Sequence, residues 1–192
     1  MKYLQNTAIW LTALLLFAFS GCNQKPAGEH TFAIGNKTFL LDGKPFVIHY
    51  TRIPAEYWEH RIQLCKALGM NTICIYAFWN IHEQKPGEFD FSGQNDIAAF
   101  CRLAQKYDMY IMLRPGPYVC SEWEMGGLPW WLLKKDDIKL RTNDPYFLER
   151  TKLFMNEIGK QLADLQITKG GNIIMVQVEN EYGSYATDKE YI

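Results

Sequence analysis

Four short apolar segments recur along the chain, each separated from the next by a longer segment of mixed polarity. They are rich in β-branched and aromatic residues, which is typical of buried strands, and they span residues 45–50, 71–78, 109–113 and 172–178. The segments between them carry apolar residues three or four positions apart, which predicts helices over residues 56–68, 95–107 and 144–165. Strands that alternate with helices, without hairpins between them, predict parallel βαβ crossovers and an α/β fold.

Turn and capping residues set the expected element boundaries. Gly69 ends the first helix, Asn95 or Asp96 caps the second, and Asp144 precedes a proline that opens the third. Upstream, residues 31–40 read as a strand with a turn at positions 35–36, and Asp42-Gly43 closes a hairpin into the first apolar segment. Residues 114–143 are expected to form one long loop.

The first 21 residues predict an export signal rather than part of the fold. Lys2 gives a positive start, and residues 8–19 form an apolar run of twelve residues. A spanning helix needs about 20 apolar residues, so this run is typical of a signal peptide. The ending Ser20-Gly21-Cys22 resembles a bacterial lipoprotein signal, in which Cys22 becomes the lipidated first residue. An ordinary signal peptide that contains Cys22 is the alternative.

The signal divides the chain into three parts: residues 1–21 as signal, 22–30 as a polar tether, and 31–192 as the folded domain. We therefore expect an exported protein of the periplasm or outer membrane, with membrane contact only through an anchor at Cys22.

Charge and cysteine content narrow the function classes. The 192 residues include 20 basic and 21 acidic side chains, a net charge of −1 that gives no reason to expect a nucleic-acid partner. The five cysteines contain no C-x-x-C pair and are too sparse for a disulfide-stapled domain, so buried thiols are expected, with a single bridge left open.

Polar and aromatic residues concentrate where each predicted strand ends, at positions 49–52, 76–80, 114–118 and 179–183. In parallel α/β folds the loops that leave the carboxyl ends of the strands build the site. We therefore expect these four clusters to converge on one polar, ring-lined pocket.

The composition of the clusters suits chemistry on sugars. A carboxylic acid at a strand end, such as Glu181, can donate a proton to a leaving oxygen, provided that partial burial keeps it protonated. Retaining glycoside hydrolysis needs a second carboxyl group about 5–5.5 Å away. Sugars have an apolar face and a hydroxyl rim, so rings such as Trp79 and Trp123, together with Asn180 and Glu122, would match them.

Four longer motifs carry a specific resemblance. In order, they are IHYTRIP at residues 48–54, FWNIHE through PGEFDFSG at 78–93, LRPGPYVCSEWEMGGLPWWL at 113–132, and VQVENEYGSY at 176–185. Together they resemble the β-galactosidases of glycoside hydrolase family 35, from about residue 39 to the last residue.

The resemblance implies a (β/α)8 TIM barrel, of which only the first half, about four βα units, is present. It also implies retaining, exo-acting hydrolysis of terminal non-reducing β-D-galactose from oligosaccharides or polysaccharides, with no metal or cofactor. Carried over by position, Glu181 would be the proton donor and later the general base, and Asn180 would hold the sugar. Tyr76 and Glu122 would bind galactose hydroxyls, while Ser121 stands at the pocket wall where the family often has alanine.

The family's nucleophile is a glutamate on a later strand, which the resemblance puts beyond residue 192. A complete barrel typically needs about 250 residues. We therefore expect this chain alone to have no useful turnover. A non-catalytic, lipid-anchored glycan-binding protein and a β-glycosidase with another sugar preference are the alternatives.

Several residues also have a simpler interpretation. Glu181 could be a structural carboxylate paired with Arg114 or Arg52, and Glu179 is expected to have that role. Metal ligation could also be considered for His49, His82 and Glu83. Their spacing has no zinc signature, however, and favours hydrogen-bonded supporting roles. Trp130 and Trp131 could line the site or pack beneath the loop.

Overall fold

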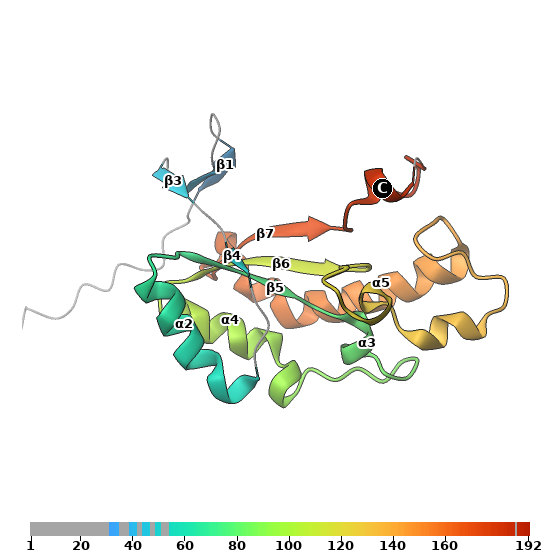
Figure 1. Ribbon diagram of the computed structural model, residues 1–192, viewed down its shortest axis with the longest axis horizontal. Coiled ribbons are helices and arrows are strands. Elements are labelled where there is room, and N and C mark those ends of the chain that lie inside the picture. Colours follow the sequence, from blue (N-terminus) through green and yellow to red (C-terminus); the bar gives the residue numbers. More distant parts are fainter. Residues whose placement is uncertain (1–30, 35–38, 42–43, 47–48, 51–53, 187) are drawn as a thin grey trace, which may run out of the picture.

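The computed structural model describes residues 31–34, 39–41, 44–46, 49–50, 54–186 and 188–192 (Figure 1). The predicted signal and tether, Cys22 and Arg52 lie outside the described residues.

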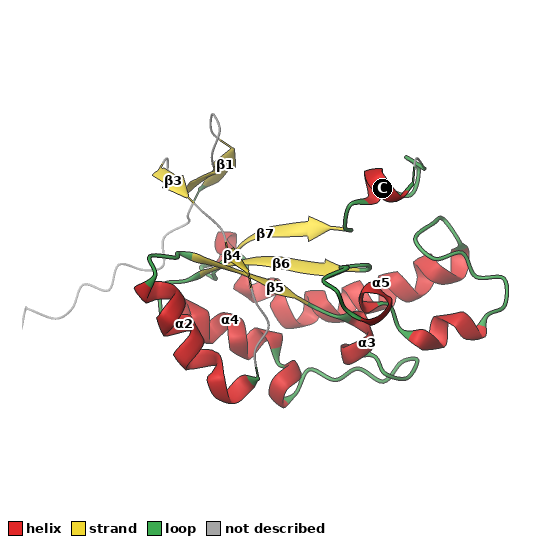
Figure 2. Ribbon diagram, viewed as in Figure 1, coloured by secondary structure: helices red, strands yellow, loops and turns green. Residues whose placement is uncertain are grey.

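The centre of the molecule is a four-stranded parallel sheet (Figures 1 and 2). Its strands are β4 (His49–Tyr50), β5 (Thr72–Tyr76), β6 (Tyr110–Gly116) and β7 (Ile173–Val178), and they lie side by side in chain order. Every neighbouring pair is parallel. The predicted α/β fold with a parallel sheet is therefore confirmed.

The crossovers between these strands are helical, as their periodicity predicted. They are formed by α2 (Trp58–Ala67), after the short 3-10 turn η1 (Ala55–Tyr57), by α4 (Ile97–Lys106) and by α5 (Pro145–Leu162). Figure 2 shows these three helices on the same side of the sheet. Two one-turn helices, α3 (Trp79–His82) and α6 (Tyr182–Tyr185), follow the ends of β5 and β7. None of the helices described here has both the length and the apolar character needed to cross a bilayer.

The helix boundaries follow the capping residues in the sequence. Oδ1 of Asp96 accepts a hydrogen bond of 2.7 Å from the backbone N–H of Ala99, and Oδ1 of Asp144 accepts one of 3.0 Å from that of Phe147. Each bond satisfies a backbone donor that has no partner within the first turn of a helix. After α2, Gly69 takes a left-handed φ of +80°, which glycine adopts without steric cost.

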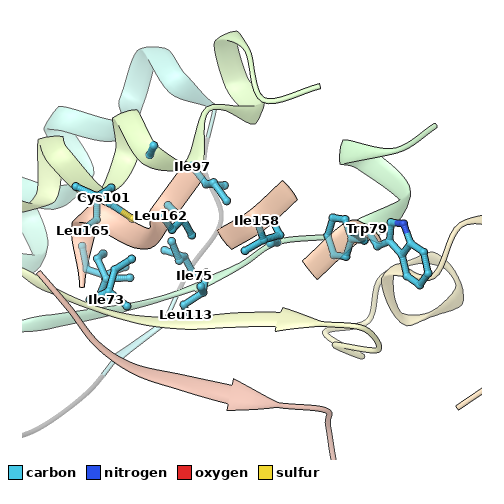
Figure 3. Packing of buried hydrophobic residues seen from close by; sticks show 14 of the residues in the cluster. Ile73, Ile75, Trp79, Ile97, Cys101, Leu113, Ile158, Leu162 and Leu165 are labelled. Atoms are coloured by element: carbon cyan, nitrogen blue, oxygen red, sulfur yellow. The ribbon is translucent and has the colours of Figure 1, made fainter. Parts of the chain in front are cut away.

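The core lies between the sheet and the helices (Figure 3). Ile73 and Ile75 of β5 and Leu113 of β6 face this layer. Around them, α4 contributes Ile97 and Cys101, and α5 contributes Ile158 and Leu162. Burial of these apolar side chains holds the crossovers against the sheet.

The predicted strand at residues 45–50 is wrong as a single element. Residues 44–46 form β3 (Lys44–Phe46), which pairs antiparallel with β2 (Phe39–Leu41), and β2 pairs antiparallel with β1 (Phe32–Ile34). Residues 49–50 belong to the parallel sheet. A continuous apolar run cannot show where the chain leaves one sheet and enters another, because that depends on the pairing partners.

Strand β7 was expected to be internal, but it lies at the edge of the described sheet. It pairs with β6 on one side, and Val176 and Val178 are 44% and 74% exposed. The apolar run correctly predicted a strand. Its burial depends on a second neighbouring strand, which the described residues do not provide.

The segment predicted as one long loop is more ordered than expected. β6 continues to Gly116, because Gly116 still pairs with Val178 of β7. The remainder contains the 3-10 turns η3 (Glu124–Gly127) and η4 (Trp130–Lys134).

The four described cysteines are free thiols: Cys65, Cys74, Cys101 and Cys120. Cys74 and Cys101 are buried, as expected, whereas Cys65 and Cys120 are half-buried. Burial raises the pKa of Cys101 to about 12 and that of Cys74 to about 11.

Candidate active site

Three strand ends meet at the guanidinium group of Arg114. Its Nη1 donates a hydrogen bond to the hydroxyl of Tyr76 at the end of β5, and its Nη2 donates one to Oδ1 of Asn180 after β7. The guanidinium carbon also lies 4.4 Å from the centre of the Tyr76 ring, within the range of a cation–π contact. One residue from each of the second, third and fourth clusters is therefore in contact at this guanidinium group.

Arg114 itself has no site role in the sequence-based prediction, where it is only a candidate partner of Glu181. Residues 111 and 113 of β6 are buried in the core, so residue 114 belongs to the opposite face of the strand. It also lies directly opposite Tyr76 in the register of the parallel pair. A charged residue directly after an apolar strand was the only available signal.

The turn that follows β7 presents Glu181 to solvent. Both Glu179 and Glu181 have left-handed backbone conformations, with φ of 58° and 50°, and Glu181 precedes the first residue of α6. Its carboxylate is exposed and forms no hydrogen bond or ion pair with the residues described here. The expected partial burial is therefore not seen in the described chain, and Arg114 contacts Asn180 instead of pairing with Glu181.

Glu179 has the structural role that was expected of it. Its carboxylate forms a buried ion pair with Arg141, with Nη2 and Oε2 2.7 Å apart, and accepts a 2.9 Å hydrogen bond from the hydroxyl of Tyr191. Burial, followed by the negative charge of Glu179, raises the pKa of Tyr191. Sequence reasoning missed Arg141, because it lies in the long loop with no local motif around it.

The loop after β6 carries the other predicted sugar ligands. Cys120, Ser121 and Glu122 have consecutive left-handed φ values of 60°, 56° and 49°, and the Glu122 side chain is exposed. The loop is tied to the end of β5 by Trp123, whose Nε1 donates a 3.1 Å hydrogen bond to Oδ1 of Asn80.

A ring-lined cavity of about 350 Å³ lies beside Tyr76. Phe78 connects its aromatic walls: its ring is stacked 5.5 Å from Tyr76 and lies 4.9 Å from Trp123. The remaining lining includes Trp58 of α2 and Phe100 of α4. Neither Asn180 nor Glu181 lines this cavity, so the aromatic surface and the carboxylate are adjacent parts of the same sheet end rather than one enclosed pocket.

Trp79 was expected among the rings of the pocket, and this expectation is wrong. Its side chain is fully buried and stacks against Phe154 of α5 at 5.2 Å. Trp131 is also buried, whereas Trp130 is exposed. Alternation along the chain could not reveal this, because Trp79 begins a helical turn that rotates its side chain into the core.

His82 and Glu83 make hydrogen bonds within the protein. Nδ1 of His82 lies 2.9 Å from the carbonyl oxygen of Asp90, and Oε1 of Glu83 accepts a 2.7 Å bond from the backbone N–H of Gly87. Among the described residues, no group of three or more histidine, cysteine or acidic side chains is placed to hold a metal ion.

The fold and site define a parallel α/β protein whose polar groups gather at the carboxyl ends of the strands. The family model described as Glycosyl hydrolases family 35 matches residues 34–192. The chain belongs to this family.

Curated relatives agree with that assignment. The chain is 44% identical to a β-galactosidase of Xanthomonas manihotis, over 98% of this chain and 32% of that protein. It is 48% identical to a β-galactosidase of Mus musculus, over 80% of this chain and 25% of that protein. The chain thus spans about a third or less of the length of these relatives.

Solved structures share the fold at low sequence identity. A GH5_18 protein from Streptomyces cattleya, in complex with GlcNAc, matches with a TM-score of 0.60 and 16% identity over 75% of this chain and 35% of that chain. A β-galactosidase from Marinomonas ef1 matches with a TM-score of 0.53 and 15% identity over 72% of this chain and 22% of that chain.

Proposed function

We propose that this chain supplies the first half of a (β/α)8 barrel in a retaining exo-β-galactosidase, which removes terminal non-reducing β-D-galactose from glycans. Family membership and the curated β-galactosidases support the reaction class. Four parallel strands with helices on one side support the barrel, since a barrel carries its helices on the outside.

In this proposal Glu181 donates a proton to the leaving oxygen and later acts as the general base. Its exposed carboxylate, at the carboxyl end of a parallel strand, supports this role. Once the sugar and the rest of the enzyme enclose it, the carboxyl group loses contact with water. An acid in such surroundings can remain protonated until the glycosidic bond breaks.

The contacts of Arg114 support the sugar-binding roles most directly. One guanidinium group holds both the Tyr76 hydroxyl and the Asn180 amide oxygen, so these two groups are fixed in relation to each other before substrate arrives. The Asn180 Nδ2, which donates hydrogen bonds, is then directed away from the guanidinium and is proposed to bind the hydroxyl beside the anomeric carbon. Tyr76 is proposed to bind a second hydroxyl.

Glu122 and Ser121 are proposed to complete the sugar pocket from the loop after β6. The neighbouring residue Trp123, which is tied to Asn80, holds this loop beside the end of β5. Glu122 would accept hydrogen bonds from galactose hydroxyls, and Ser121 would form part of the wall.

The nucleophile is proposed to be a glutamate in sequence that follows residue 192. The relatives are about three times as long as the matched region, which leaves room for it. We therefore expect residues 1–192 alone to release no galactose from an aryl β-galactoside. Measurable retaining hydrolysis by that piece would contradict the proposal.

The experiment that tests the reaction is Glu181→Gln in the intact gene product. Glutamine keeps the size of the side chain but cannot donate the proton, so hydrolysis of an alkyl β-galactoside should fall by about 10²–10⁴-fold. In kcat/KM, which reports the steps up to release of the leaving group, an activated dinitrophenyl galactoside should lose far less, because its leaving group needs no proton. Unchanged hydrolysis of both substrates would sink the assignment, and Glu149→Gln on the surface of α5 is the matched control.

The two alternatives give different outcomes in a panel of aryl glycosides. A non-catalytic glycan-binding protein would bind galactose without hydrolysing any member of the panel. A β-glycosidase with another preference would hydrolyse a different sugar faster than galactose.

The export signal is a separate proposal, since it lies outside the described residues. Cys22 is proposed to carry a lipid that holds the protein in the periplasm or at the outer membrane. Labelled palmitate fed to a bacterial host should enter the protein, and Cys22→Ala should abolish that labelling. Equal labelling of both forms would refute the anchor.

A further inference from the structure

The ion pair between Arg141 and Glu179 is the more enclosed of two buried arginine–glutamate pairs in the described chain. Nε and Nη2 of Arg141 lie 3.2 Å and 2.7 Å from Oε1 and Oε2 of Glu179, so the pair is bidentate. The two side chains are only 6% and 3% exposed. A buried charge needs such complete pairing, because removing one partner leaves the other without compensation.

The same two groups also hold the backbone on both sides of Asn180. Oε2 of Glu179 accepts a 2.9 Å hydrogen bond from the N–H of Asn180, while Nη2 of Arg141 donates a 2.7 Å bond to its carbonyl oxygen. That carbonyl belongs to the peptide that leads into Glu181. The orientation of both peptide planes is therefore tied to the ion pair.

The turn needs this restraint, since its backbone is otherwise unfavourable. Glu179 and Glu181 both have left-handed φ values, which residues other than glycine rarely adopt. Such conformations persist where surrounding contacts hold them, and they cluster at functional sites. Here the surrounding contacts come from the buried pair.

Arg141 is itself fixed from three directions. Its guanidinium carbon lies 4.0 Å from the ring centre of Tyr118, after β6, and 4.1 Å from that of Tyr185, in α6. The hydroxyl of Tyr182 donates a 3.0 Å hydrogen bond to the Arg141 carbonyl oxygen. The pair thus connects the long loop before α5 to the turn that presents the proposed proton donor.

We propose that Arg141 and Glu179 are positioning residues, which set the directions of the Asn180 and Glu181 side chains without touching the substrate. This inference rests on the proposed function of Glu181. A misdirected acid weakens protonation of the leaving group, and a displacement of about 1 Å can cost about 100-fold in rate. The effect should therefore depend on how much the leaving group needs a proton.

The test is Arg141→Lys in the intact gene product, with activity normalised to folded protein. Lysine keeps the charge but loses the bidentate geometry. We expect kcat/KM for an alkyl β-galactoside to fall about 10–100-fold, with a loss below about 5-fold for a dinitrophenyl galactoside. Tyr191→Phe removes one hydrogen bond to Glu179. It should also lower activity on the alkyl galactoside more than on the dinitrophenyl galactoside, by a smaller factor than Arg141→Lys.

The matched control is Arg150→Lys, at the other buried pair. Arg150 pairs with Glu83, and its guanidinium carbon lies 5.1 Å from the centre of a Trp131 ring. If Arg141 has only a structural role, both lysine variants should give less folded protein. The ratio of their activities on the alkyl and dinitrophenyl galactosides should then equal that of the parent. That result for Arg141→Lys, or for Tyr191→Phe if the lysine variant does not fold, would overturn the inference.

The two proposals can fail separately. If Glu181→Gln discriminates between the substrates and the Arg141 and Tyr191 variants do not, only the positioning role is wrong. If Glu181→Gln itself shows no discrimination, the acid assignment fails and the positioning role fails with it.

Discussion

Nε1 of Trp79 donates a 2.6 Å hydrogen bond to Oε2 of Glu83, and both side chains are completely buried. The other carboxylate oxygen of Glu83 pairs with Arg150 and accepts a bond from the backbone N–H of Gly87. This joins α3, the loop after it and α5 through one carboxylate. A buried carboxylate is tolerated only while its oxygens keep such partners.

Trp79→Phe should therefore destabilise the fold by more than the loss of buried apolar area alone would. The substitution leaves Oε2 of Glu83 buried without its donor, which costs about 1–3 kcal/mol in the free energy of unfolding. Urea denaturation of the intact gene product measures this value. Trp123→Phe is the control, because its indole also donates a hydrogen bond, to Asn80, but the ring is 38% exposed. Equal losses in the two variants would contradict the role given to Glu83.

Substitution of alanine for glycine should have opposite effects on stability at two positions. A Cβ on Gly171 would lie 2.0 Å from the carbonyl oxygen of Leu165, so Gly171→Ala must displace the backbone before β7 and should cost about 1–3 kcal/mol. Gly159 is exposed within α5, and a Cβ built there would meet no described atom within 4 Å apart from the backbone of its own helix and its chain neighbours. Gly159→Ala should stabilise the protein by about 1 kcal/mol. Thermal unfolding compares the two, and a stable Gly171→Ala variant would show that this approach is not tight.

The buried thiols should resist alkylation in the folded protein. Burial raises the pKa of Cys101 to about 12 and that of Cys74 to about 11, so at pH 8 very little of either is the reactive thiolate. Iodoacetamide should modify the half-buried Cys65 and Cys120 first. Peptide mass spectrometry before and after addition of urea provides the measurement. Rapid labelling of Cys101 without urea would mean that α4 does not pack as described.

Asp144 should make the start of α5 sensitive to acid. The backbone N–H of Phe147 lowers the pKa of the Asp144 carboxyl group below its ordinary value. A group with a lowered pKa in the folded state stabilises the protein above its unfolded pKa of about 4, and this stabilisation is lost as the pH falls through the folded value. Asp144→Ala should therefore unfold more easily than the parent protein at pH 7.

The difference between the Asp144→Ala and parent melting temperatures should shrink towards pH 3, where the parent carboxylate is protonated. Asp144→Asn keeps an oxygen acceptor at the cap and should lose less stability at pH 7. A difference between alanine variant and parent that stays constant from pH 7 to pH 3 would contradict the charge effect.

Much of the architecture followed from local pattern. Apolar runs and helical periodicity located the parallel strands and the three crossover helices, and Asp96, Asp144 and Gly69 marked helix ends. These features depend on interactions within a few residues, which the chain order already contains. The family motifs likewise singled out Tyr76 and Asn180, which the structure brings to one guanidinium group. The sugar-binding and catalytic roles proposed for all five site residues stay predictions: Tyr76, Ser121, Glu122, Asn180 and Glu181.

Only the tertiary structure decided which distant side chains contact the residues of those motifs. Arg114 and Asn180 are 66 positions apart, and Arg141 and Glu179 are 38 apart, so their contacts exist only after the strands have aligned. Trp79 lies in the core rather than in the pocket because a helical turn rotates it inward. By itself, the sequence determined the order of the elements and the residue types at the strand ends. The packing of distant segments determined which of these groups face one another, because burial and pairing depend on partners that no local pattern specifies.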